Sequence, residues 1–204
     1  MKHALSLWIV ALVLLGCSKL ETDSAKAKTM AAWKALQKVD HDVDNSNLAA
    51  LKLDDPATFP PVIKYYRDVA FGYSQIDTEG VDEMLVNHLQ DSMKVHTQMA
   101  NALQSVLDDV IVLMKSREGG LDTSRAVGRF FADDEHQQSG AGFAELLYRL
   151  STDDDFQNKL EEIRSKHRSE VLGAEDTFNK VADEDKSVAK SLTEKYGVQF
   201  IDTF

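Results

Sequence analysis

Cysteine is almost absent from this chain of 204 residues, with Cys17 as the only example. A single thiol excludes an intramolecular disulfide, and it excludes a metal site built from several cysteines. Proline is also scarce, with three residues and none after Pro61. Because proline removes a backbone donor and interrupts helices, its scarcity leaves long helices possible over most of the chain.

The sequence motifs of common enzymes are missing as well. The chain after Cys17 contains no nucleophile motif, no glycine-rich loop for phosphate and no His-Glu zinc motif. Acidic clusters such as Asp153-Asp154-Asp155 lack the twelve-residue loop, with its central glycine and terminal glutamate, that binds calcium. We therefore expect no enzymatic activity, no bound metal and no cofactor, and we assign the acidic clusters to helix starts and exposed faces.

Basic residues are in the minority, 23 against 34 acidic ones, which gives a formal net charge of −11. Loss of the first sixteen residues, argued below, would remove Lys2 and take the charge to about −12. Such a surface repels the phosphates of nucleic acids and of anionic lipids, so neither is expected as the main partner. A basic protein is the partner that this charge favours.

Residues 1–16 have the anatomy of a secretory signal peptide. Lys2 precedes an apolar run from Ala4 to Leu15 that is interrupted only by Ser6, and the chain turns polar after Cys17. Twelve helical residues rise about 18 Å, well short of the roughly 30 Å hydrocarbon core of a bilayer. The run is therefore predicted to direct export and not to persist as a transmembrane helix.

Leu14-Leu15-Gly16-Cys17 ends this run and resembles the lipobox of bacterial lipoproteins. The resemblance covers residues 1–17, and it implies that residues 1–16 are removed and that Cys17 is acylated. Two or three acyl chains, at about 0.8 kcal/mol per buried methylene, would anchor the protein in the lipid bilayer. The other interpretation, an unmodified free thiol, does not explain why the only cysteine lies between an apolar run and a polar segment.

In Gram-negative lipoproteins the residue after the acylated cysteine biases sorting, and aspartate there favours the inner membrane. Ser18 occupies this position. The resemblance therefore implies an anchor in the outer membrane, with the protein facing the periplasm.

Apolar residues at spacings of three and four predict helices over most of the remaining chain. Helices are expected at 25–40, from Phe59-Pro60-Pro61 to Ile76, from Asp77 or Thr78 to about Arg117, and from 151–155 to Val181, with a last helix near 185–196 before Gly197. Shorter helical segments are expected at 48–53, at 123–131 and at 143–150.

These elements predict an all-α fold, an antiparallel bundle of about four long helices with additional short helices. Residues 17–24 would carry the lipidated cysteine and a tether, and residues 25–204 would form a single helical-bundle domain. The segment Val198-Gln199-Phe200-Ile201 is the one stretch expected to be extended, as a strap that packs its aromatic side chains on the bundle.

Two of the predicted long helices each place a histidine, His96 and His167, in the middle of an apolar stripe. Because both lie about midway along their helices, we expect them at a similar depth, in one polar layer. Four further side chains could face this layer: Tyr66, Tyr73, Ser92 and Glu170. A buried polar group without a hydrogen bond costs about 1–3 kcal/mol, so these groups are expected to pair. His88, two turns before His96, is expected at the surface.

Two interpretations of this layer remain open. In the first, a His–Tyr or His–Glu pair fixes the register of the helices. In the second, His96 and His167 bind a metal ion, a haem or another small ligand, since imidazole is the commonest transition-metal ligand. Neither histidine has the glutamate three residues earlier that ferritin-like sites use, and a single cysteine excludes c-type haem attachment.

Together these features predict a membrane-anchored lipoprotein of the cell envelope that acts without catalysis. Its helical domain would serve as a protein-binding module, such as an adaptor, an assembly factor or an inhibitor of the immunity-protein type. The alternative is a helical bundle that binds a metal or cofactor through His96 and His167.

Overall fold

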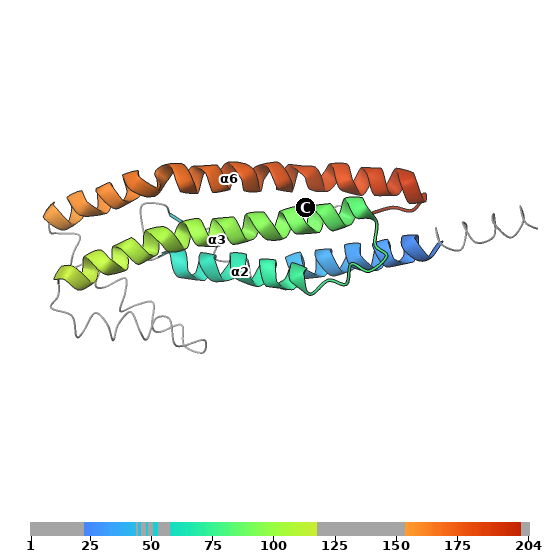
Figure 1. Ribbon diagram of the computed structural model, residues 1–204, viewed down its shortest axis with the longest axis horizontal. Coiled ribbons are helices and arrows are strands. Elements are labelled where there is room, and N and C mark those ends of the chain that lie inside the picture. Colours follow the sequence, from blue (N-terminus) through green and yellow to red (C-terminus); the bar gives the residue numbers. More distant parts are fainter. Residues whose placement is uncertain are drawn as a thin grey trace, which may run out of the picture. The chain divides into compact units, whose positions relative to one another are not determined.

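The computed structural model describes residues 23–43, 45, 48, 51–52, 58–117 and 154–200. All regular structure in these residues is helical, with no strand, which confirms the predicted all-α class. The helices are 23–42, α2 (Phe59–Ser74), α3 (Glu83–Arg117) and α6 (Asp154–Tyr196) (Figure 1). None of the helices in this part of the chain combines the length and apolarity needed to span a bilayer.

Several predictions fall on residues outside this description. They include Cys17 with the run before it, the helices expected at 123–131 and 143–150, and most of the segment at 48–53. The backbone N–H of Leu48 donates to the carbonyl of Asn45 at 3.0 Å, and that of Leu51 donates to Leu48 at 3.1 Å. Both bonds span three residues, as in a 3-10 turn, and Leu48 is in 3-10 conformation, so the described residues of this segment are consistent with the predicted short helical piece.

Proline and glycine mark two helix ends in the predicted places. α2 begins at Phe59, so Pro60 and Pro61 lie in its first turn, where a backbone N–H has no partner within the helix. α6 ends at Tyr196, and Gly197 follows with a φ of 62°. That left-handed conformation, which glycine adopts without a steric cost, terminates the helix.

α3 begins at Glu83, which corrects the start predicted at 77–78. Gly80 has a φ of 71°, and a residue in this left-handed conformation does not continue a right-handed helix. Asp82 is the N-cap, because its Oδ1 accepts the backbone N–H of Met84 at 3.0 Å.

α6 is one continuous helix of 43 residues, whereas two helices meeting near 181–185 were predicted. Residues 182–184 contain neither proline nor glycine, so nothing in the backbone chemistry requires a break there. The acidic residues at these positions are compatible with a helix, since Asp183 is exposed and Asp185 contacts a partner described below.

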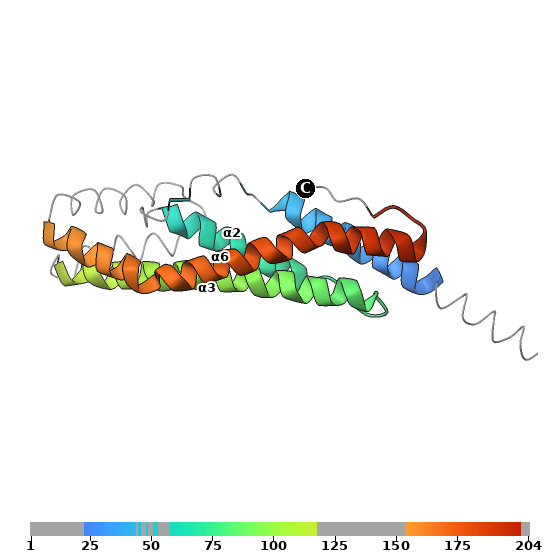
Figure 2. The ribbon, with the colours of Figure 1, turned by 90° about the horizontal axis from the view of Figure 1, so that it is seen from above.

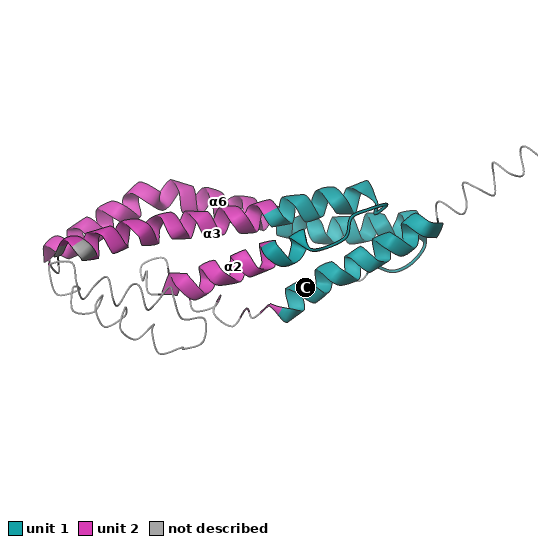
Figure 3. Cartoon of the chain, turned by 60° about the horizontal axis from the view of Figure 1, so that its bottom comes forward, with its two compact units in different colours: residues 1–42, 71–93, 180–204 teal, residues 43–70, 94–179 magenta. Residues whose placement is uncertain are grey.

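The chain divides into two compact units, coloured separately in Figure 3. Unit 1 takes its described residues from 1–42, 71–93 and 180–204, and unit 2 takes them from 43–70 and 94–179. α2, α3 and α6 each contribute residues to both units. The single domain expected over 25–204 stays a prediction.

Unit 1 includes the extended segment after α6. Phe200 is 6% exposed, and its ring packs edge-on against Trp33 with the ring centroids 5.9 Å apart. The backbone N–H of Phe200 donates to Thr193 Oγ1 at 3.0 Å. The predicted strap is therefore confirmed as far as Phe200, and the rest of it lies outside the described residues.

Unit 2 has a core in which α2, α3 and α6 meet. Its fully buried side chains include Phe59, Leu103 and Phe156. Burying an aliphatic or aromatic side chain of this size contributes about 1.5–3 kcal/mol. Within this unit α3 and α6 run antiparallel and side by side, because early residues of α3 contact late residues of α6 (Figure 2).

Candidate functional site

The two candidate histidines are buried, as predicted, but they do not share one layer. His96 and His167 are 7% and 8% exposed. His96 contacts Phe178, whereas His167 contacts Asp109, thirteen residues further along α3. Thirteen helical residues rise about 20 Å, so the two rings do not reach one common ligand. The predicted single layer is corrected to two separate clusters in unit 2.

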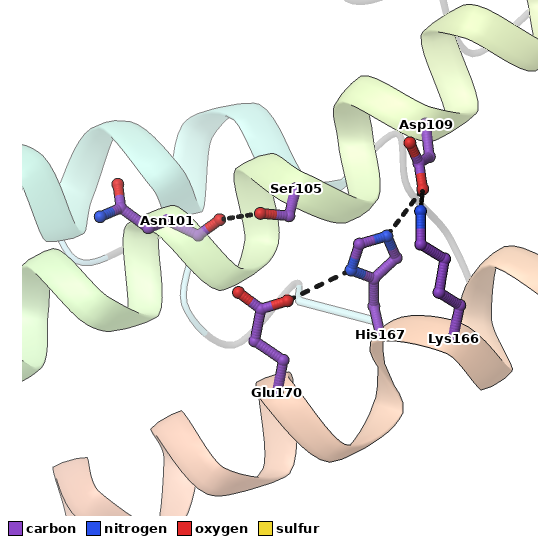
Figure 4. Close-up of polar contacts among 6 residues, drawn as sticks. All are labelled: Asn101, Ser105, Asp109, Lys166, His167 and Glu170. Carbon is purple, nitrogen blue, oxygen red and sulfur yellow. Dashed lines mark hydrogen bonds and ion pairs between the residues drawn. The ribbon is translucent and has the colours of Figure 1, made fainter.

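His167 lies in an ionic cluster between α3 and α6 (Figure 4). Its Nε2 is 2.8 Å from Asp109 Oδ2, and its Nδ1 is 3.3 Å from Glu170 Oε2. Lys166 Nζ is 2.6 Å from the same Asp109 oxygen. The pairing of His167 with Glu170 confirms one of the predicted contacts. Because a carboxylate only accepts, both histidine contacts are hydrogen bonds at the same time only when the ring is protonated.

Asp109 is the centre of this cluster. Hydrogen bonds from Lys166 and then from His167 hold the pKa of its carboxyl below the ordinary range, although partial burial acts in the opposite direction. With both ring nitrogens directed at carboxylates, His167 offers no free lone pair to a metal. The part of the chain that the structure describes also holds no group of three or more His, Cys, Asp or Glu residues arranged to bind a metal ion.

His96 lies in an aromatic cluster instead. Its ring is 5.8 Å from that of Tyr66 and 5.0 Å from that of Phe178, both edge-on. Burial raises the pKa of Tyr66 to about 12, with smaller contributions from Tyr65 and Glu175. The phenol of Tyr66 therefore remains neutral at physiological pH, and the cluster joins α2, α3 and α6 mainly through ring contacts.

Unit 1 contains a third cluster, which the sequence reasoning missed. His88 is 4% exposed, which corrects its predicted place at the surface. Its Nε2 contacts the carboxylate of Asp185, and the hydroxyl of Tyr73 donates to the carboxylate of Asp40. The four residues come from four helices, 23–42, α2, α3 and α6. Tyr73 is thus paired with a carboxylate, not with a histidine as expected.

The electrostatics of this cluster centre on Asp40. Burial raises the pKa of its carboxyl to about 6; the hydrogen bond from Tyr73 opposes the shift, the charge of Asp185 adds to it, and His88 opposes it. Asp40 Oδ2 and His88 Nδ1 are buried and have no hydrogen-bond partner in the described part of the chain. A buried unsatisfied group costs about 1–3 kcal/mol, so this cluster carries a penalty that the pairs around His167 do not.

A signal for the missed residues was present in the helical spacing. His88 lies three residues after Leu85 and four before Ser92, and both of these are buried on the same stripe. Asp185 likewise lies four residues after Val181 and three before Val188. Residues at these spacings share one face of a helix, so both polar side chains belong to the inward stripe.

Ser92, the remaining predicted member of the layer, is 5% exposed and belongs to unit 1.

A fourth cluster, also in unit 1, joins the start of α3 to the end of α6 and to the helix at 23–42. Asp82, the N-cap of α3, accepts hydrogen bonds from Lys195 at 2.6 Å and from Tyr196 at 2.7 Å. Its own backbone N–H donates to Thr29 Oγ1 at 2.9 Å. Burial acts to raise the pKa of Asp82, but the hydrogen bonds from Lys195, Tyr196 and the Met84 N–H outweigh it, so the pKa lies below the ordinary value.

The fold and these clusters define an all-α protein whose buried histidines and carboxylates hold helices together within each unit. Comparison of the chain with protein-family models, with curated proteins and with solved structures finds no match.

Proposed function

We propose that this protein is a lipid-anchored lipoprotein of the bacterial cell envelope, facing the periplasm from the outer membrane, whose helical domain binds another protein without catalysis. The observation that carries the proposal is the tetrad Leu14-Leu15-Gly16-Cys17 after an apolar run of twelve residues. Acylation at the only cysteine would place everything after it at a membrane surface.

The side-chain chemistry supports a binding role more than a metal or cofactor role. His167 directs both nitrogens to carboxylates, and His96 packs among aromatic rings. The two histidines occupy separate clusters, so the alternative that joins them at one ligand loses its geometric basis. The net charge of −11 favours a basic protein as the partner.

The anchor is tested by Cys17→Ser in the full-length chain. The wild-type protein should incorporate labelled palmitate and fractionate with membranes, whereas the variant should take up no label and either leave the membrane fraction or accumulate as the uncleaved precursor. Ser18→Asp is the matched control: it should keep the label and shift the protein to the inner membrane. An unlabelled wild-type chain, together with unchanged fractionation of Cys17→Ser, contradicts the proposal.

A further inference from the structure

Unit 2 contains a cavity of about 370 Å³ beside the His167 cluster. Three buried side chains from three helices line it: Phe59 of α2, Val106 of α3 and Val171 of α6, exposed by 1%, 4% and 7%. Cavities of about 300–1,000 Å³ with mainly apolar walls and a few polar groups are typical of small-molecule sites. The apolar walls favour a ligand with a hydrocarbon body.

The polar residues that line the cavity all come from α6: Glu161, Arg164, Ser165, His167 and Arg168. Arg164 and Arg168 both line it, one helical turn apart, and Glu161 lines it as well. Like charges at this spacing destabilise a helix, so helix stability does not account for the pair. Arg164 Nη1 is 3.2 Å from Glu161 Oε2, whereas Arg168 forms no ion pair with any residue that the structure describes. The positive charge of Arg168 is therefore not balanced by an ion pair within the described residues, although the net charge of the chain is −11.

The third basic side chain at the cavity, His167, is already occupied. Its two nitrogens contact Asp109 and Glu170, so it does not compete for an anion. Leu172, 42% exposed, adds apolar surface one turn after Arg168. A guanidinium binds a carboxylate through two parallel hydrogen bonds, and these are stronger than bonds between neutral groups.

We infer that this cavity binds a free fatty acid, with the carboxylate on Arg168 and Arg164 and the hydrocarbon chain against Phe59, Val106 and Val171. The inference goes beyond the proposed envelope role and does not rest on acylation of Cys17. Charge complementarity selects the ligand class: the walls are apolar and the unpaired charge is positive. A phospholipid, with two chains and a bulkier headgroup, is the competing source of acyl groups.

The test uses a photoreactive fatty acid with a diazirine in its chain, added to lysates that contain the full-length protein with a C-terminal affinity tag. Mass spectrometry of the isolated chain should locate cross-links in 161–172 and near Phe59. Arg168→Gln should weaken labelling about tenfold, the loss expected for one charge-assisted contact, and Arg164→Gln combined with it should weaken labelling further. Arg168→Lys, which keeps the charge but not the fork, should lie in between.

Lys159→Gln is the matched control, because Lys159 is a basic residue of α6 that pairs with Asp155 outside the cavity. This variant should leave labelling unchanged. Each arginine variant should keep the helical circular dichroism spectrum of the wild type. The methyl ester of the probe should label weakly. The inference would be overturned if the acid and its methyl ester labelled the protein equally, or if a photoreactive phospholipid labelled it as strongly as the fatty acid. Equal labelling of the wild type and the double arginine variant would overturn it as well.

Discussion

Buried carboxylates at single positions make the stability of this protein depend on pH. For Asp40, burial raises the folded-state pKa from 3.8 to about 6. The folded chain then binds more protons than the unfolded chain between about pH 4 and pH 6, so the free energy of unfolding falls as the pH rises through this range. Above about pH 6 the buried Asp40 carboxylate is charged, and its burial destabilises the folded protein to the full extent.

Asp40→Asn should therefore raise the free energy of unfolding at pH 7.5. The full shift corresponds to roughly 3 kcal/mol, and partial exposure reduces the gain to on the order of 1 kcal/mol. The amide oxygen still accepts the Tyr73 hydroxyl, which is why asparagine is the right replacement. Urea denaturation at pH 4.5, 6 and 7.5 measures the effect; the exposed Asp42→Asn is the control. A variant less stable than the wild type at pH 7.5 would show that the Asp40 charge stabilises the fold.

His96→Leu distinguishes a structural from a ligand-binding histidine. Leucine has a similar volume and keeps the contacts with Tyr66 and Phe178, so the free energy of unfolding should change by no more than about 1 kcal/mol. A chelator should not alter the melting temperature of the wild type. If chelator lowers that temperature, and His96→Leu or His167→Leu abolishes the effect, metal binding at the histidine concerned is established instead.

At the scale of helices, Gly72 lies where two helices approach each other closely, whereas Gly173 does not. A Cβ at Gly72 of α2 would lie 2.6 Å from Val39 Cγ1. A Cβ at Gly173 of α6 would have no atom of the described residues within 4 Å, apart from its chain neighbours and the nearby backbone of its own helix. Gly72→Ala should cost about 1–3 kcal/mol through overpacking, which exceeds the gain in helix propensity. Gly173→Ala should stabilise by about 0.5–1 kcal/mol. Thermal melts of the two variants are a matched pair, and shifts of the same sign would contradict the packing of α2 against 23–42.

Because α6 is one continuous helix, proline should be tolerated at its start but not in its middle. Asp183 is exposed in the middle of this helix, whereas Asp154 is its first residue. Asp183→Pro should cost about 3 kcal/mol or more, because it removes a helical hydrogen bond and clashes with the preceding turn. Asp154→Pro should be tolerated in the first turn. Denaturation curves measure the two effects, and equal tolerance of both prolines would support the predicted break near 181–185 instead of one continuous helix.

At the scale of the whole molecule, net charge determines the long-range attraction between the protein and a partner. With a net charge of −11, a protein partner captured by the full-length chain should be basic. Its association should slow as the ionic strength rises, because salt shortens the range of the attraction from about 10 Å at 0.1 M to about 3 Å at 1 M. Association kinetics at several salt concentrations test this, and rates independent of salt would point to an apolar interface instead.

Much of the fold followed from local chemistry. Spacings of three and four, the prolines at the start of α2 and Gly197 after α6 predicted helices and ends that the structure contains, because helical periodicity and backbone conformation depend on residues close in the chain. The predicted start of α3 and the predicted break within α6 were wrong because acidic and polar residues are compatible with both a turn and an exposed helix, and only packing decides between them.

The sequence by itself determined the helical class and the burial of His96 and His167. Tertiary structure alone decided their partners on other helices, together with the burial of His88, whereas the contact of His167 with Glu170 is local to α6. His167 and Asp109 are 58 residues apart in the chain, and His88 and Asp185 are 97 apart. Helical periodicity assigns a side chain to a face, but the axial alignment of two distant helices decides which side chain it meets. That alignment depends on the packing of the whole interface between the helices, which no local spacing records.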